Sequence, residues 1–252
     1  MKTGIYRIWY NIRGLLFFLA VLVIPALFLF ITKVVSDRYA TGRLNVFIRE
    51  PLFLITLNYL LIFGVYFILK KIFTIQICLF SAENWFVTMG KAFRPALISF
   101  FVGFVSLIAI IQIFEILPLP ESVKSWMKIP NQGYLELFDG INDKNALKIM
   151  IWFCYIIVVA PVAEEIIFRG FLQDSLGKFL NKFNADLIIT SLIFSLFHIN
   201  SLSNALYSFI IGIFLSLERK KSGYINVSVW VHVMINFTGL FYGILVNYLS
   251  NN

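Results

Sequence analysis

Residues 160–170 read APVAEEIIFRG, and they follow the apolar stretch IMIWFCYIIVV at residues 149–159. Two adjacent glutamates and an arginine therefore stand in a segment whose composition is typical of a membrane helix. An ionisable side chain inside such a helix costs about 3 kcal/mol on the insertion scale, and it usually marks a functional site. This stretch therefore predicts a transmembrane helix that carries chemistry.

The composition extends this prediction to the whole chain. Of its 252 residues, 60% are hydrophobic and only 13% are charged, whereas soluble domains are about 45–50% apolar. A helix crosses a bilayer with about 20 apolar residues. We therefore predict an all-α, polytopic bundle of seven spans, with 71–86 as a possible eighth, re-entrant or interfacial piece. The seven lie at 14–32, 51–69, 95–114, 146–172, 185–200, 204–217 and 224–249.

One long polar stretch, residues 121–148, separates the first three predicted spans from the later four. No internal repeat is visible on either side of it. We therefore predict amino-terminal spans and an outer loop over residues 1–140, and a catalytic membrane core over residues 141–252.

The basic residues predict an orientation. With the amino terminus inside, the predicted inner loops hold 13 Lys and Arg and the outer loops hold 8, which favours a cytoplasmic amino terminus. The net charge of +8 then indicates topology and contact with anionic lipid rather than nucleic acid. The Ile-, Asn-, Lys- and Phe-rich composition suggests the cell membrane of a bacterium.

Three short motifs stand out in the later half of the chain. Residues four apart share one face of a helix, which pairs Glu165 with Arg169 and leaves Glu164 on another face. The same spacing places Phe194 beside His198. It also joins His232 to Asn236. The motifs are EEIIFR at 164–169, FSLFH at 194–198 and HVMIN at 232–236, and they include both histidines of the chain.

This asymmetry predicts a division of roles between the two glutamates. Glu165, compensated by Arg169, would hold the helix, while Glu164 would face a polar intramembrane cavity as a general base. Imidazole and carboxamide N–H groups could stabilise an oxyanion, so the set suits hydrolysis of an amide or ester. Alternatively, a carboxylate and two histidines could bind zinc, although the HExxH spacing is absent.

EExxxR, FxxxH and HxxxN, in this order on successive predicted helices, resemble the CPBP intramembrane proteases, the CAAX-protease and bacteriocin-processing family also called Abi. The resemblance covers about residues 146–240. It implies an all-helical membrane endopeptidase in which Glu164 activates water.

The same resemblance implies roles for the other residues. His198 would position the water or bind a metal, and His232 with Asn236 would stabilise the oxyanion, with Arg169 and Phe194 as structural support. The resemblance does not decide whether the enzyme uses a metal. A divalent ion such as zinc would be held by Glu164, His198 and His232. The predicted catalytic set is Glu164, Glu165, His198, His232 and Asn236.

Other interpretations remain beside this one. Glu164, Glu165 and Arg169 could form an ion cluster in the head-group zone. A lone histidine is often a core residue, and Asn236 could be a hydrogen-bonding link between helices.

At the level of function, a non-proteolytic scaffold that regulates a partner such as a sensor kinase is the main alternative, and a transporter is a third. For a protease we expect a peptide or membrane-protein substrate. Peptide maturation or bacteriocin self-immunity fits better than a prenylated CAAX substrate. Oligomeric state is left open.

Overall fold

A computed structural model describes residues 60, 64, 85–127, 137–141, 143–177, 180, 184–199 and 201–250. The predicted spans at 14–32 and 51–69, and the segment 71–86, lie outside the described residues apart from single positions. All described secondary structure is helical, so the all-α class is confirmed for this part of the chain. The count of seven to eight spans stays a prediction.

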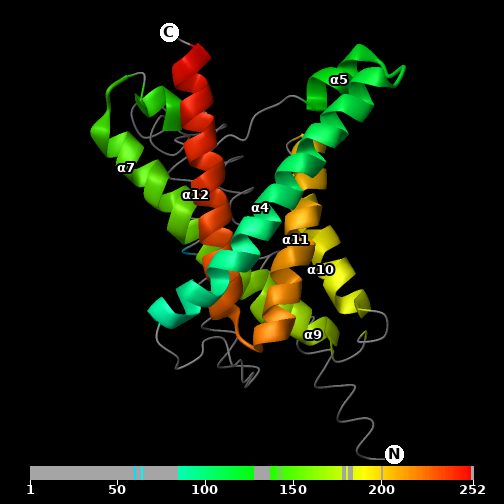
Figure 1. Cartoon of the computed structure of the whole chain (residues 1–252), viewed down its shortest axis with the longest axis vertical. Helices are drawn as coiled ribbons and strands as arrows, with labels where there is room; N and C mark the ends of the chain where they lie inside the picture. The colour runs from blue at the N-terminus through cyan, green and yellow to red at the C-terminus, as the bar shows by residue number, and fades with distance from the viewer. Residues whose placement is uncertain are drawn as a thin grey trace, which may run out of the picture. The chain divides into compact units, whose positions relative to one another are not determined.

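The helices belong to one compact unit, Cys78–Asn252. The predicted boundary near residue 140 stays a prediction. The helices are α4 (Trp85–Ile116), α5 (Glu121–Met127), α7 (Ala146–Cys154), η1 (Tyr155–Val159), α8 (Ala160–Glu164), η2 (Glu165–Gln173), α9 (Asp174–Gly177), α10 (Ala185–Leu196), α11 (Leu202–Ser222) and α12 (Ile225–Ser250). Figure 1 shows α4 crossing α12, with α10 and α11 on one side and α7 on the other.

Helix α4 is longer than the span predicted at 95–114. It begins at Trp85 and contains Pro95, so residues 85–94, before the predicted start of the span, are also helical. Proline removes one backbone donor, but membrane helices tolerate it where neighbouring groups satisfy the backbone. The Ser99 hydroxyl donates to the Pro95 carbonyl at 2.7 Å, but this carbonyl is not the one that loses its donor, which lies four residues before Pro95.

The two predicted spans at 185–200 and 204–217 also have different limits. Helix α10 ends at Leu196, and the chain turns sharply before Ser201, whose hydroxyl accepts the Asn204 N–H and caps α11. Helix α11 continues through the charged residues 218–221 to Ser222 and ends at Gly223, whose φ of +77° is left-handed, a backbone conformation that glycine adopts without strain.

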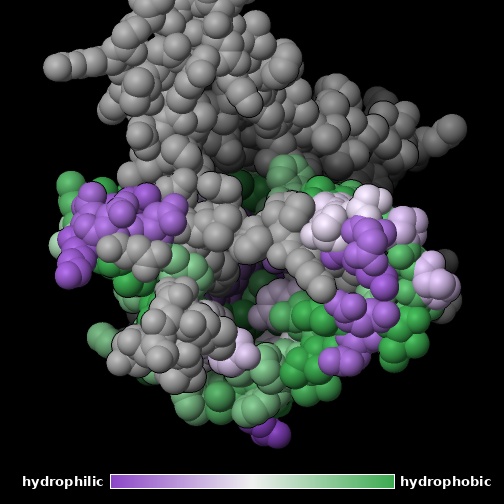
Figure 2. Space-filling model, turned by 90° about the horizontal axis from the view of Figure 1, so that it is seen from above, coloured by the Kyte–Doolittle hydropathy of each residue, from purple (hydrophilic) through white to green (hydrophobic). Residues whose placement is uncertain are grey.

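Three helices of the described part are long and apolar enough to cross a membrane, namely Phe86–Ile116, Ala146–Gly177 and Ile225–Ile244. The spans predicted at 95–114, 146–172 and 224–249 are thereby confirmed as helices of this kind. Helix α10 is apolar but shorter, and α11 is not among the three. Figure 2 shows mainly hydrophobic residues on the described surface seen from above, with hydrophilic residues gathered toward opposite sides.

Small residues let these helices approach closely, as is usual where helices pack in lipid. Ala92 and Ala96 of α4 are buried against a cluster from α11 and α12 that includes Leu215 and Val231. A Cβ added to Gly103 would lie only 2.8 Å from the Tyr207 ring. Helix α4 therefore supports α11 and α12, the helices that carry or support the later motifs.

The Ala146–Gly177 helix changes its winding twice, at η1 and at η2. At the first change the Ala160 N–H donates to the Tyr155 carbonyl, five residues back. The next residue, Pro161, has no N–H and disturbs the regular α-helical ladder. π-helical segments are uncommon and often occur at functional sites, and here the second one begins at Glu165, directly after Glu164.

Gly212 provides a test of this packing. A Cβ at this position would lie 3.1 Å from the Ser191 Cβ and 3.3 Å from the Phe194 ring. We expect Gly212→Leu to destabilise the protein by about 1–3 kcal/mol because overpacking displaces α10 from α11. Gly90→Leu is the matched control, since a Cβ at Gly90 would meet nothing within 4 Å. Thermal unfolding in detergent measures both, and equal unfolding temperatures for the two variants would contradict the packing.

Candidate active site

Glu164 lies where two other helices approach the long Ala146–Gly177 helix. Its Oε2 is 3.9 Å from the His198 Nε2 and 3.7 Å from the His232 Nε2. The carboxylate is half-buried, with 17% of its side chain exposed. The structure therefore brings the first glutamate of the pair together with both histidines of the chain, from three separate sequence motifs.

His198 is held by its backbone surroundings. Its Nδ1 lies 2.8 Å from the Phe194 carbonyl, and a carbonyl can only accept, so Nδ1 carries the proton. In the neutral ring, Nε2 is then the acceptor and faces Glu164. The turn that presents His198 is fixed as well, because the Asn204 carboxamide donates to the His198 carbonyl at 3.0 Å.

His232 is oriented by the second glutamate. Its Nδ1 donates to the Glu165 Oε1 at 3.0 Å, and both side chains are buried. A carboxylate on Nδ1 fixes which ring nitrogen carries the proton and stabilises the ring when it is doubly protonated. Glu165 thus directs the Nε2 of His232 toward Glu164.

Arg169 compensates the charge of Glu165, as the spacing predicted. The Arg169 Nη1 lies 3.0 Å from the same Oε1, and both side chains are fully buried. The Arg169 Nη2 also donates to the Gly212 carbonyl at 3.2 Å. One carboxylate oxygen therefore binds two cationic or potentially cationic groups, and Arg169 connects this helix to α11.

The charges of the cluster balance if one imidazole is protonated. Glu164 and Glu165 then contribute two negative charges, and Arg169 and one histidinium contribute two positive charges. Buried charges persist where they are paired and hydrogen-bonded, so an electroneutral set is the arrangement that an apolar surrounding favours. Of the two rings, His232 is the one that contacts both carboxylates.

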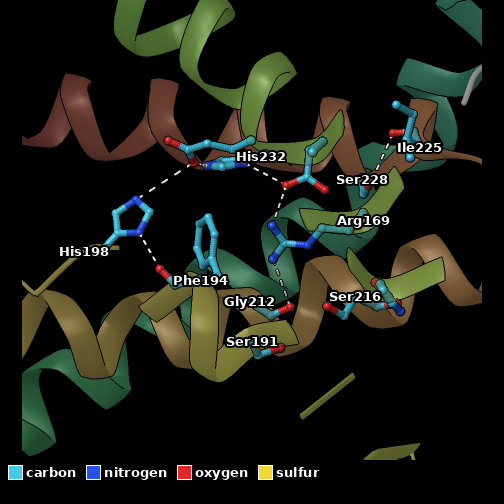
Figure 3. Close-up of polar contacts among 12 residues, drawn as sticks. Arg169, Ser191, Phe194, His198, Gly212, Ser216, Ile225, Ser228 and His232 are labelled. Atoms are coloured by element: carbon cyan, nitrogen blue, oxygen red, sulfur yellow. Dashed lines mark hydrogen bonds and ion pairs between the residues drawn. The ribbon is translucent and has the colours of Figure 1, made fainter. Parts of the chain in front are cut away.

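Phe194 forms an apolar partition inside this polar cluster. The centre of its ring lies 4.4 Å from that of His198, and 4.5 Å from the Arg169 guanidinium carbon. Figure 3 shows the ring between His198 and Arg169. Its predicted place beside His198 is confirmed, and the ring contributes a cation–π contact and keeps the guanidinium on the side of Glu165.

Asn236 lies elsewhere. Its Nδ2 donates to the Ile156 carbonyl in η1 at 2.9 Å, one helical turn beyond His232. The described hydrogen bond of Asn236 therefore connects α12 with η1, and it does not join the group around Glu164. The oxyanion role of Asn236 stays a prediction, while the alternative of a link between helices has a direct counterpart in the structure.

Several supporting residues were not singled out from the sequence. Gln173 donates to the Ser216 carbonyl at 3.0 Å, one turn after the bond from Arg169 to Gly212. A polar residue recurs every fourth position at Glu165, Arg169 and Gln173. This polar stripe on an otherwise apolar helix could have indicated Gln173 from the sequence. Asn204 and Ser195 stabilise the turn at His198, and no local pattern marks them because their acceptors are backbone carbonyls set by the fold.

The predicted metal ligands can be compared with this geometry. One carboxylate and two imidazoles are a donor set that zinc accepts. Within the part of the chain that the structure describes, however, no group of three or more His, Cys, Asp or Glu side chains is arranged to hold a metal ion. The metal stays a prediction.

Arg169 provides a test of the charge cluster. We expect Arg169→Met to destabilise the fold by about 3–5 kcal/mol, because it leaves the buried Glu165 carboxylate without its partner. The matched control is Lys221→Met, which removes the ion pair with Glu218 at an exposed site, where such pairs contribute at most about 1 kcal/mol. Unfolding in a detergent–denaturant series measures the difference. Similar losses of stability in the two variants would show that the buried pair of Arg169 and Glu165 contributes no more than the exposed pair.

Comparison with known proteins agrees with the motifs. Residues 146–238 match the family model Rce1-like, described as type II CAAX prenyl endopeptidase Rce1-like. No curated protein and no solved structure matches the chain. The family and the three long apolar helices fit an integral membrane protein. The matched residues 146–238 contain all three motifs, and the match agrees with the resemblance to the CPBP proteases.

Proposed function

We propose that this protein is an intramembrane endopeptidase that hydrolyses a peptide bond with water activated by Glu164. The observation that carries the proposal is the approach of both histidine Nε2 atoms, at 3.7 and 3.9 Å, to one oxygen of this carboxylate. These distances are longer than a direct hydrogen bond. They suit a water molecule that contacts Glu164 and a histidine at the same time.

In the proposed reaction, Glu164 removes a proton from the water while the water oxygen bonds to the carbonyl carbon of the substrate. The Nε2 of His198 accepts a hydrogen bond from the second hydrogen of that water, which stays on the oxygen, and so orients the water. Collapse of the tetrahedral intermediate breaks the C–N bond. The proton held by Glu164 then passes to the leaving amine, so a carboxylic acid and an amine are formed.

His232 has the second role in this proposal. As an imidazolium it donates from Nε2 to the oxygen that becomes negative in the intermediate. The Glu165 carboxylate at its Nδ1 supports that charged form, and Arg169 keeps Glu165 ionised and in position. The pair Glu165 and Arg169 therefore acts on the reaction through the orientation and charge of His232.

The proposed substrate is a membrane-associated peptide or protein, since the carboxylate lies within a helix long and apolar enough to cross the bilayer. The family model that matches is described as type II CAAX prenyl endopeptidase Rce1-like. We propose, from the bacterial character of the composition, that unprenylated peptides are the substrates, as in peptide maturation or bacteriocin self-immunity. A cytoplasmic amino terminus and a multi-pass topology are part of the same proposal.

The substitution Glu164→Gln tests the central claim. Purified protein in nanodiscs is incubated with membrane-anchored peptides, both prenylated and unprenylated, and products are identified by mass spectrometry. We expect a loss of cleavage of about 10²–10⁴-fold, the usual contribution of a general base. Glu121→Gln is the matched control, because Glu121 is exposed on α5, and it should cleave as the wild type does.

Other outcomes of this experiment have distinct meanings. If the wild type and Glu164→Gln cleave equally, Glu164 is not the base. If neither cleaves any peptide while both bind a membrane partner, the scaffold function replaces the protease. The reaction is also repeated with a strong zinc chelator. Loss of cleavage would indicate that Glu164, His198 and His232 hold a metal, and unchanged cleavage would support the metal-free reaction.

A further inference from the structure

The Ile156 carbonyl is left without its usual backbone donor. In an α-helix this donor would be the N–H of Ala160, and in a π-helix it would be the N–H of residue 161. The Ala160 N–H instead donates to Tyr155, and residue 161 is a proline, which has no N–H. The acceptor lies in a buried part of the helix, since Ile156 is 8% exposed.

A side chain from another helix replaces the missing donor. The Asn236 Nδ2 lies 2.9 Å from the Ile156 carbonyl. A buried carbonyl without a partner costs free energy comparable to a lost hydrogen bond, and in the membrane no bulk water can satisfy it. Pro161 and Asn236 are therefore complementary, although 75 positions separate them in the sequence.

This contact is one of several polar contacts between α12 and the long helix. His232 and Asn236 are four residues apart on one face of α12. His232 binds Glu165 at 3.0 Å, and Asn236 binds Ile156 at 2.9 Å. The two hydrogen bonds lie one helical turn apart on the same face of α12, so together they constrain both its height and its rotation against the long helix.

We propose that Asn236 is a positioning residue whose carboxamide replaces the N–H that Pro161 lacks, and that it thereby sets the orientation of His232 toward Glu164. The part that concerns cleavage rests on the proposed protease function. The part that concerns the fold stands on the contact itself. This role differs from direct stabilisation of the oxyanion, the role that the resemblance implied for Asn236.

A double-mutant cycle with Pro161→Ala tests the proposal. Alanine at 161 restores a backbone N–H, so the Ile156 carbonyl gains a donor whether the segment winds as an α-helix or a π-helix. In the wild-type background we expect Asn236→Ala to lower the apparent unfolding temperature by about 2–8 °C and the turnover rate about tenfold. In the Pro161→Ala background both losses should be less than half as large.

Thr238→Val is the matched control for the cycle. Its hydroxyl donates to the Met234 and Ile235 carbonyls of its own helix, so its effect should be the same in both backgrounds. Asn236→Gln, which keeps a carboxamide N–H, is the conservative second variant. It should retain more turnover than Asn236→Ala if the donor is what matters, and it keeps the test usable if the alanine variant does not fold.

Two results would overturn the proposal. One is an equal loss of unfolding temperature for Asn236→Ala with Pro161 and with Ala at 161. The other is a fall in kcat of about 10²–10³-fold, the size expected for an oxyanion donor, that is the same in both backgrounds with KM unchanged. Failure of the protease function looks different: the wild type then cleaves nothing, while the cycle of unfolding temperatures still decides the role of Asn236.

Discussion

The arrangement of the site depends on one buried carboxylate oxygen. The Glu165 Oε1 accepts a hydrogen bond from Arg169 and another from His232, both at 3.0 Å. Neither partner shares a helix with the other, so this atom joins the long Ala146–Gly177 helix to α12 directly and to α11 through the bond from Arg169 to Gly212. A charge in an apolar surrounding must be paired, and that requirement determines which groups converge here.

Glu164 is available for chemistry because Glu165, and not Glu164, forms the buried contacts with Arg169 and His232 that hold the helices together. Glu164 remains half-buried and faces the Nε2 atoms of both histidines, while Glu165, one residue later, is fully enclosed. The winding of the helix contributes to this difference. Glu164 ends α8 and Glu165 begins the π-helical segment η2, while the earlier segment η1 ends shortly before Pro161, whose lack of an N–H makes the regular ladder impossible.

Much of this was predictable from short-range patterns. The Glu165–Arg169 pair and the placement of Phe194 beside His198 follow from four-residue spacing, and the structure contains both. Helix limits were less predictable. Helix α4 continues past Pro95 to Trp85, and α10 ends before His198, where Ser201 caps the start of α11; hydropathy does not mark such limits.

The sequence by itself determined an all-helical membrane architecture for the described part, the three motifs, and which residues share a helical face, since these depend on composition and on local periodicity. Tertiary structure decided which motif residues meet. It placed both histidines at Glu164, and it directed Asn236 to the Ile156 carbonyl instead. These contacts join helices far apart in the chain, and they arise because each buried donor or acceptor must find a partner in a surrounding without bulk water.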